Sequence, residues 1–136
     1  MSFRVEDRWA IRDLSARYAL ATDRRDFDAV GRLFSDEVVY GRITGMEIMG
    51  IGREAALAHM RSHFGAHPTP TFHYVHDAVI DFDAEDVDRA KGVVVSHAES
   101  HVEGRRVVHA VRYHDDYVRA GGRWRIAARW LEFPLR

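Results

Sequence analysis

The stretch IRDLSARYALATDRRDFDAVGRLFSDEVVY, residues 11–40, predicts two helices that lead into a strand. Apolar side chains recur at steps of three and four between residues 5 and 22, which is the spacing of one helix face. They are Ile11, Leu14, Tyr18 and Ala21. Asp26 is a good N-cap for a second, short helix, whose apolar side carries Phe27, Val30, Leu33 and Phe34. The stretch ends in Val38-Val39-Tyr40, which predicts a strand.

The rest of the chain changes its period from that of helices to that of strands. A glycine-rich turn is expected first, at Gly41, Gly45, Gly50 and Gly52. A third helix then fits Arg53 to Phe64, with Leu57, Met60 and Phe64 facing inward. Four segments follow in which β-branched or aromatic residues alternate with polar ones: 71–83, 92–103, 106–119 and 123–133. This order predicts one α+β domain, residues 1–136, with three N-terminal helices packed on one face of a curved, mainly antiparallel sheet.

Composition excludes several functional classes. The chain has 136 residues, a formal net charge of −1 and no cysteine, so disulfides and thiolate chemistry are excluded. Basic and acidic residues are mixed along the chain, whereas nucleic-acid binders gather a basic excess on one face. No apolar run approaches the roughly 20 residues that span a bilayer, and the charged beginning MSFRVEDRW lacks the apolar part of a signal peptide. We expect a cytoplasmic protein that binds neither nucleic acid nor membrane.

Two histidines lie three positions apart in TFHYVHD, residues 71–77. Side chains alternate between the two faces of a strand, so His73 and His76 leave opposite faces of an uninterrupted strand and cannot bind one metal ion. His73 then shares its face with Val75, Asp77 and Val79, and His76 shares the other with Phe72, Tyr74, Ala78 and Ile80. Neither face is plainly the apolar one. The pattern alone therefore does not decide which histidine points inward.

Other polar residues also fall within the predicted strands. Arg123, Arg125 and Arg129 alternate with Trp124 and Ile126, which predicts a solvated outer face on the last strand. His59 and His63 are four positions apart on the third helix, the spacing of helical zinc ligands. They lie at the edge of the apolar face, however, and no third ligand can be identified. We expect no metal site.

Asp23 occupies an unusual position, because the first helix ends there and the helix dipole disfavours a negative charge at that end. One explanation is that Arg24 and Arg25, which follow at once, offset the charge. The other is that the carboxylate points into a pocket and orients a basic side chain, since such carboxylates stabilise the charged form of a histidine. The sequence leaves both explanations open.

Three segments together resemble the SnoaL-like group of the nuclear-transport-factor-2-like superfamily. Residues 11–40 resemble the opening helices of that family, with its tyrosine, its turn aspartate and its FSDE segment in order. TFHYVHDAVIDFD resembles its first long strand, and VRYHDDYVRAGGRWRIAAR resembles its closing hairpin. The resemblance covers nearly the whole chain and implies a cone-shaped α+β barrel of cystatin-like fold, with an apolar pocket between the helices and the sheet.

Within the group, the pattern is most similar to the scytalone dehydratase and hexachlorocyclohexane dehydrochlorinase type. Those enzymes use an aspartate at the end of the first helix and a histidine at the start of the first long strand, which match Asp23 and His73. The resemblance implies an elimination without a cofactor, in which His73 removes a proton and Asp23 orients it. Tyr40 and His97 match a water-binding tyrosine and a second histidine. The substrate-binding residues expected in all are Tyr18, Tyr40, Met60, Phe64, His97 and Tyr113.

The resemblance also implies a small cyclic, hydrophobic or polyketide-like substrate and assembly as a homodimer or homotrimer. A non-catalytic binding or scaffold protein of the same fold is the alternative, as is a cyclase or isomerase of the same group. The related steroid isomerases need a base carboxylate after the second helix. Between Glu37 and Glu47 this chain has no acidic residue, which argues against that mechanism.

Overall fold

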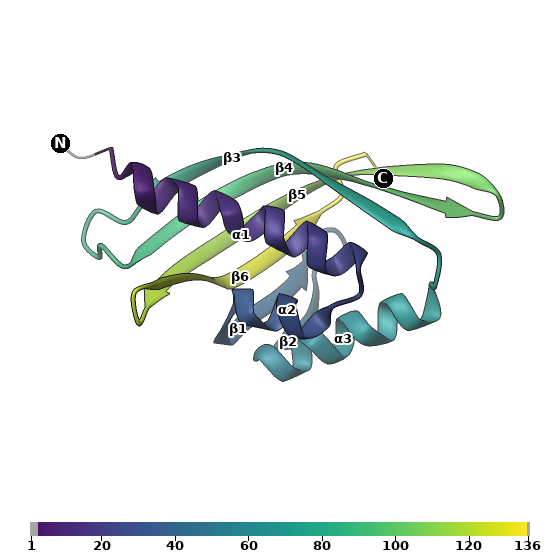
Figure 1. Ribbon diagram of the computed structural model, residues 1–136, viewed down its shortest axis with the longest axis horizontal. Coiled ribbons are helices and arrows are strands. Elements are labelled where there is room, and N and C mark those ends of the chain that lie inside the picture. Colours follow the sequence, from purple (N-terminus) through teal and green to yellow (C-terminus); the bar gives the residue numbers. More distant parts are fainter. Residues whose placement is uncertain (1–2, 136) are drawn as a thin grey trace.

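The chain folds into three helices on one face of a six-stranded sheet, as Figure 1 shows. This computed structural model describes residues 3–135, so positions 1, 2 and 136 of the predicted domain lie outside the described residues. The elements are α1 (Val5–Asp23), α2 (Phe27–Leu33), β1 (Phe34–Arg42), β2 (Glu47–Ile51), α3 (Arg53–Ala66), β3 (Thr71–Phe82), β4 (Arg89–Val102), β5 (Arg105–Ala120) and β6 (Arg123–Glu132). The predicted α+β class, with helices on one side of a curved sheet, is confirmed.

The strands lie in the order β2-β1-β6-β5-β4-β3. Every neighbouring pair is antiparallel except β1 and β6, which run parallel. The helix α1 crosses the inner face of the sheet, and α2 and α3 lie near β1 and β2 (Figure 1). This arrangement brings the C-terminal end of α1 to the start of β3, which is the location of the two residues predicted to act together.

The helices bury the side chains that their periodicity predicts. On α1 these are Ile11, Leu14, Tyr18 and Ala21, each at most 8% exposed. The predicted cap of α2 is also present, since the carboxylate of Asp26 accepts a hydrogen bond from the N–H of Ala29 at 3.1 Å. Leu57 and Met60 are buried on α3, and Phe64 packs against the core.

The segment predicted as a glycine-rich turn contains a strand. Residues 47–51 form β2, which pairs with β1 before the chain enters α3. Gly50 pairs with Tyr40 in this strand, and the residue is a glycine because the backbone of α3 passes directly over it. A Cβ atom at Gly50 would lie 2.6 Å from the backbone nitrogen of Ala56, closer than such atoms approach. The glycine therefore permits a close strand–helix contact here rather than ending the strand.

Two of the β-bulges in the sheet, one on β3 and one on β6, reverse the alternation of side chains along these long strands. On β3, Val75 pairs with Ser96 and Asp77 with Val95, so His76 is an extra residue. Beyond this bulge the inward side chains are Ala78 and Ile80, which are 8% and 3% exposed. The prediction that His73 shares a face with Asp77 and Val79 is therefore wrong.

The second bulge lies on β6 and has a similar effect. Asp116 pairs with Ala128 and Tyr117 with Ile126, which leaves Ala127 as the extra residue. Arg129 consequently points inward together with Ile126, and its side chain is 0% exposed. The predicted solvated face for Arg129 is thus wrong, because the alternation was counted through the bulge.

Arg129 is the centre of a buried polar network. Its Nε and Nη2 donate to the two carboxylate oxygens of Asp115 at 3.0 and 2.8 Å, and Nη2 also donates to the hydroxyl of Ser15 at 2.7 Å. Tyr117 donates to Asp115 at 2.6 Å. Burial alone would lower the pKa of Arg129, but the charge of Asp115 and their hydrogen bonds hold it above its ordinary value. The network fixes β5 and β6 to α1 in the interior.

Candidate active site at the end of the first helix

Asp23 is the last residue of α1, and its carboxylate faces β3. Oδ2 accepts a hydrogen bond from the backbone N–H of His73 at 2.9 Å, and Oδ1 accepts one from the hydroxyl of Thr71 at 3.0 Å. The helix dipole disfavours a carboxylate at this end of a helix, and these donors from the sheet offset that penalty. The charge of Asp23 is therefore stabilised by β3 and not only by the arginines that follow it.

The imidazole of His73 meets the same carboxylate. Its Nδ1 lies 2.6 Å from Oδ1 of Asp23, and the two side chains are only 13% and 17% exposed. Because a carboxylate accepts hydrogen bonds, the proton of the neutral ring lies on Nδ1 and the lone pair on Nε2. Among the described residues, no side chain or backbone group bonds to this Nε2. The arrangement leaves a nitrogen that can accept a proton, next to a carboxylate that can stabilise the resulting cation.

A second layer of contacts holds Asp23 and His73 in place. Arg25, in the left-handed backbone region at φ 58°, donates through Nη1 to the hydroxyl of Thr71 at 2.8 Å. The same nitrogen bonds to the carbonyl oxygen of Thr22, and Nη2 bonds to that of Thr69 at 2.9 Å. Because Thr71 accepts from Arg25, its own hydroxyl proton is directed to Asp23. Arg25 thus connects the end of α1 to the start of β3.

Sequence reasoning did not identify Thr71 and Arg25 as parts of this site. The strand period offers a signal for Thr71, because it lies two positions before His73 and so on the same face. No comparable signal exists for Arg25, whose contact with Thr71 spans 46 positions. Its role depends on how α1 and β3 meet in the folded protein.

A cavity of about 240 Å³ lies between α3 and the ends of β1 and β6. Three side chains predicted to meet a substrate, Tyr40, Met60 and Phe64, line it. The other lining residues are Arg42, Glu47, Met49, His59, His63, Leu131 and Phe133. Neither Asp23 nor His73 is part of its wall. A wider hollow of about 620 Å³ lies between α1, α2 and the turn from β5 to β6, and it also excludes both residues.

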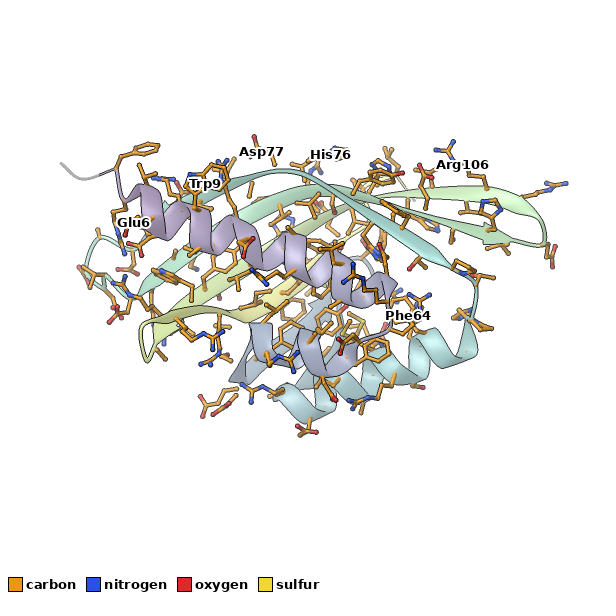
Figure 2. All side chains as sticks on the ribbon, viewed as in Figure 1. Glu6, Trp9, Phe64, His76, Asp77 and Arg106 are labelled. Carbon is orange, nitrogen blue, oxygen red and sulfur yellow. The ribbon has the colours of Figure 1, made fainter. Side chains whose placement is uncertain are left out.

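Phe64 lies between the cavity and Arg25, the side chain that holds Thr71 beside Asp23. One side of its ring faces the guanidinium of Arg25, 4.3 Å from the ring centre, and it stacks on Phe27 at 5.9 Å. In Figure 2, Phe64 is seen between the C-terminal end of α1 and α3. The same side chain therefore forms a wall of the cavity and covers the arginine that holds Thr71.

Tyr18 and Tyr113, also predicted to meet a substrate, lie in the core and do not line the cavity. The hydroxyl groups of Tyr18 and Tyr40 are 2.9 Å apart, and the ring of Tyr113 meets the edge of Tyr18 at 5.6 Å. Arg129 lies over the rings of Tyr18 and Tyr113. Burial raises the pKa of Tyr40 to about 12, so its hydroxyl keeps its proton at neutral pH. Tyr40 thus lines the cavity, while its hydroxyl bonds to that of Tyr18 in the core.

His97 does not belong to this site, contrary to the sequence-based expectation. It pairs with Tyr74 on the outer face of the sheet, opposite to His73, and its ring stacks on Tyr74 at 4.4 Å. Its Nδ1 lies 2.7 Å from Nε2 of His76. Figure 2 shows His76 along the outer side of β3, far from Phe64 in that view. The correspondence of His97 with a pocket histidine fails because its position on β4 is outward.

The histidines of α3 stack along one side of the helix. The rings of His59 and His63 are nearly parallel at 6.4 Å, and His67 lies 5.0 Å beyond His63. Within residues 3–135, no group of three or more histidine, cysteine, aspartate or glutamate side chains is arranged to hold a metal ion. None of the helices in the same range is long and apolar enough to cross a membrane.

Comparison with solved structures identifies many chains with the same architecture. An NTF2-like protein with a cystatin-like fold from Novosphingobium aromaticivorans is 23% identical, with a TM-score of 0.82 over 96% of this chain and 84% of the other. A hexachlorocyclohexane dehydrochlorinase is 20% identical, with a TM-score of 0.81 over 96% and 87%. A protein of N. aromaticivorans named provisionally as a scytalone dehydratase is 19% identical, with a TM-score of 0.79 over 96% and 86%. These likenesses establish the fold.

A search of curated protein sequences found no match. The model of the SnoaL-like domain matches residues 4–130, nearly the full length of the chain. This match agrees with the helix-first order, the curved sheet and the cystatin-like neighbours. The chain belongs to the SnoaL-like domain family, and it has the cystatin-like fold of the NTF2-like protein described above.

Proposed function

We propose that the protein is a lyase that eliminates water or a halide from a small cyclic molecule, with His73 as the base and Asp23 as its partner. The observation that carries the proposal is the 2.6 Å contact between Nδ1 of His73 and the carboxylate of Asp23. It gives the ring a defined tautomer and leaves Nε2 free of protein partners within the described part of the chain. The fold shared with a dehydrochlorinase adds support of a general kind.

In the proposed reaction, Nε2 of His73 takes a proton from a carbon beside the one that carries the leaving group. The electron pair of the broken C–H bond forms the new double bond, and the leaving group departs with its own bonding pair. Asp23 stabilises the imidazolium that His73 becomes. A halide needs no proton when it leaves. A hydroxyl group leaves as water, and the proton that it needs is the one that His73 has taken from carbon, which also returns His73 to its neutral form.

The proposal assigns the substrate to the cavity beside α3. Its apolar side chains bury a ring, and Phe64 is the side chain between this space and the Asp23–His73 pair. We assign to Phe64 a rotation that joins the cavity to His73 when a substrate binds. Phe64→Ala should then accept bulkier substrates than the unaltered protein does.

Two classes of compound test the activity: chlorinated cyclohexanes, followed by chloride release, and cyclic β-hydroxy ketones, followed by mass spectrometry for the loss of water. His73→Ala should reduce turnover to below about 1% of the starting rate, since general-base catalysis supplies about 10²–10⁴-fold. His76→Ala is the matched control, because that histidine is exposed on the same strand. Full activity of His73→Ala would exclude His73 as the base.

A non-catalytic binding protein is the second candidate. The observation that favours it is that neither Asp23 nor His73 lines the cavity. Binding of cyclic compounds without turnover of any substrate in either class would support this alternative. A product with the same mass as its substrate would instead indicate a cyclase or isomerase of the same family.

We also propose self-association as a dimer or trimer, which the family resemblance implies. The outer face of the sheet supplies apolar area for a second copy, with Phe72, Val79 and Val95 at 57%, 63% and 45% exposed. Sedimentation velocity checks this assembly. A monomer at micromolar concentration would contradict it.

A further inference from the structure

The cavity beside α3 is lined by two chemically different groups of side chains, which are called its apolar side and its polar side below. Its apolar side is formed by Tyr40, Met49, Met60, Phe64, Leu131 and Phe133. Its polar side carries Arg42, His59 and His63, and Glu47 is the one acidic residue in the wall. Such a division is typical of sites that bury a ring and orient it by one polar group.

Arg42 has hydrogen-bonding capacity that the protein does not use. Its Nη2 donates to Glu47 at 2.7 Å, whereas its Nη1 has no acceptor within residues 3–135. Its Nε also lacks an acceptor there but is closed off from solvent. The side chains of Arg42 and Glu47 are 34% and 48% exposed, so their ion pair is partly solvated and weak. The guanidinium binds carboxylates through two parallel donors. A carboxylate on a bound molecule can therefore accept hydrogen bonds from the part of the Arg42 guanidinium that Glu47 does not use.

The histidines of the wall add hydrogen-bond donors to this side. The ring of His63 lies 6.4 Å from that of His59 and 5.0 Å from that of His67, which follows the end of α3. Burial first, and then neighbours that include Arg25 and Arg42, lower the pKa of His63. Its ring is therefore neutral at pH 7 and can donate one N–H to a bound carboxylate, beside the permanent charge of Arg42.

The size of the cavity limits what can enter. Its volume of about 240 Å³ lies just below that of typical ligand pockets, about 300–1,000 Å³. One or two fused rings fit this space, whereas a long chain or a nucleotide does not.

We propose that the cavity binds a one- or two-ring molecule that bears a carboxylate, with the ring against Met60, Phe64 and Phe133 and the carboxylate at Arg42 and His63. Only the identification of this molecule as the substrate of the enzyme rests on the proposed function. The binding itself follows from the cavity wall. Arg42 and His63 select the anion, and His73 plays no part in that selection.

Calorimetric titration with matched pairs of compounds tests the proposal. Benzoate, 1-naphthoate and 2-naphthoate are each compared with the neutral amide of the same ring. We expect at least one carboxylate to bind about tenfold or more tightly than its amide at pH 7. Arg42→Gln and His63→Gln should each remove most of that preference. Arg106→Gln is the control, because Arg106 also pairs with a glutamate, Glu99, but on the outer face.

Equal binding of acid and amide in every pair would overturn the proposal, as would a complete lack of binding by all three carboxylates. An undiminished preference in both Arg42→Gln and His63→Gln would overturn it too. His73→Ala separates this proposal from the catalytic one. If it keeps the preference for carboxylates while the unaltered protein shows no turnover, the binding site stands and the proposed lyase activity fails.

Discussion

Oδ1 of Asp23 lies 2.6 Å from Nδ1 of His73, which joins the end of α1 to the start of β3 across 50 positions of the sequence. The other carboxylate oxygen accepts the backbone N–H of the same histidine. Asp23 therefore holds both the main chain and the ring of His73. This double contact fixes the position of the ring as well as its tautomer.

Replacing Asp23 by Asn should reduce turnover about 10²–10⁴-fold. In the original protein both carboxylate oxygens of Asp23 accept hydrogen bonds from β3, whereas the amide of Asn offers only one acceptor oxygen. The amide also has no charge to stabilise the imidazolium. Initial rates of elimination measure the loss. Asp13→Asn is the control, because Asp13 is an exposed acid on the same helix, paired with Arg17. A rate within twofold of the original for Asp23→Asn would contradict the proposed partnership.

Thr71→Val should lower kcat while leaving KM nearly unchanged. The change removes the hydroxyl that donates to Asp23 and accepts from Arg25, so the carboxylate loses one of its positioning contacts. Thr71→Ser keeps that hydroxyl and should restore most of the rate. Steady-state kinetics of the three proteins provide the comparison. A Ser variant as impaired as the Val variant would indicate a packing role for Thr71 instead.

Arg129→Met should destabilise the fold by roughly 3–5 kcal/mol, because Asp115 would be left as an unpaired buried charge. Urea unfolding followed by tryptophan fluorescence measures the change in the free energy of unfolding. Arg123→Met, at an exposed position of the same strand, should change it little. The double change Arg129→Met with Asp115→Leu should recover part of the loss. A double variant less stable than the single one would argue against the unpaired-charge explanation.

His63 should make the protein less stable as the pH falls below about 6.5. Burial, and then nearby cations, lower its pKa in the folded state. As the pH falls, His63 therefore takes up its proton in the unfolded chain before it does so in the folded protein. The free energy of unfolding decreases from the ordinary histidine pKa of about 6.5 down to the lowered pKa of the folded state. Melting temperatures between pH 7.5 and 5 for the original protein and for His63→Gln reveal this contribution. If the melting temperatures of the two proteins change with pH in the same way, His63 makes no such contribution and the prediction is wrong.

Much of the fold follows from local periodicity. The side chains of α1, α2 and α3 that recur every three or four positions are the ones that the core buries, and the four long strands lie close to their expected bounds. Helix periodicity is reliable here because each helix has one buried face and one exposed face. The strand β2 was missed, because glycine at 50 serves a close contact with α3 rather than a turn.

The faces of the sheet were harder to predict, for one physical reason. Counting by twos assumes an uninterrupted strand, and the extra residues at His76 and Ala127 break that count. Arg129 was accordingly placed outside when it is buried. The pair Asp23 and His73 was suggested by family resemblance, while the roles of Arg25 and Thr71 depend on contacts between distant segments that no local pattern encodes.

Because His76 is the extra residue of a bulge, substituting it and deleting it should have very different effects on the fold. Its side chain is exposed, so exchanging it for another polar residue removes little beyond the contact with His97. Deleting it would shift the frame of β3 by one residue. Either Ala78 and Ile80 would then turn to solvent, or His73 would turn away from Asp23. One extra residue thus keeps the half of β3 that bears His73 in phase with the half that faces the core.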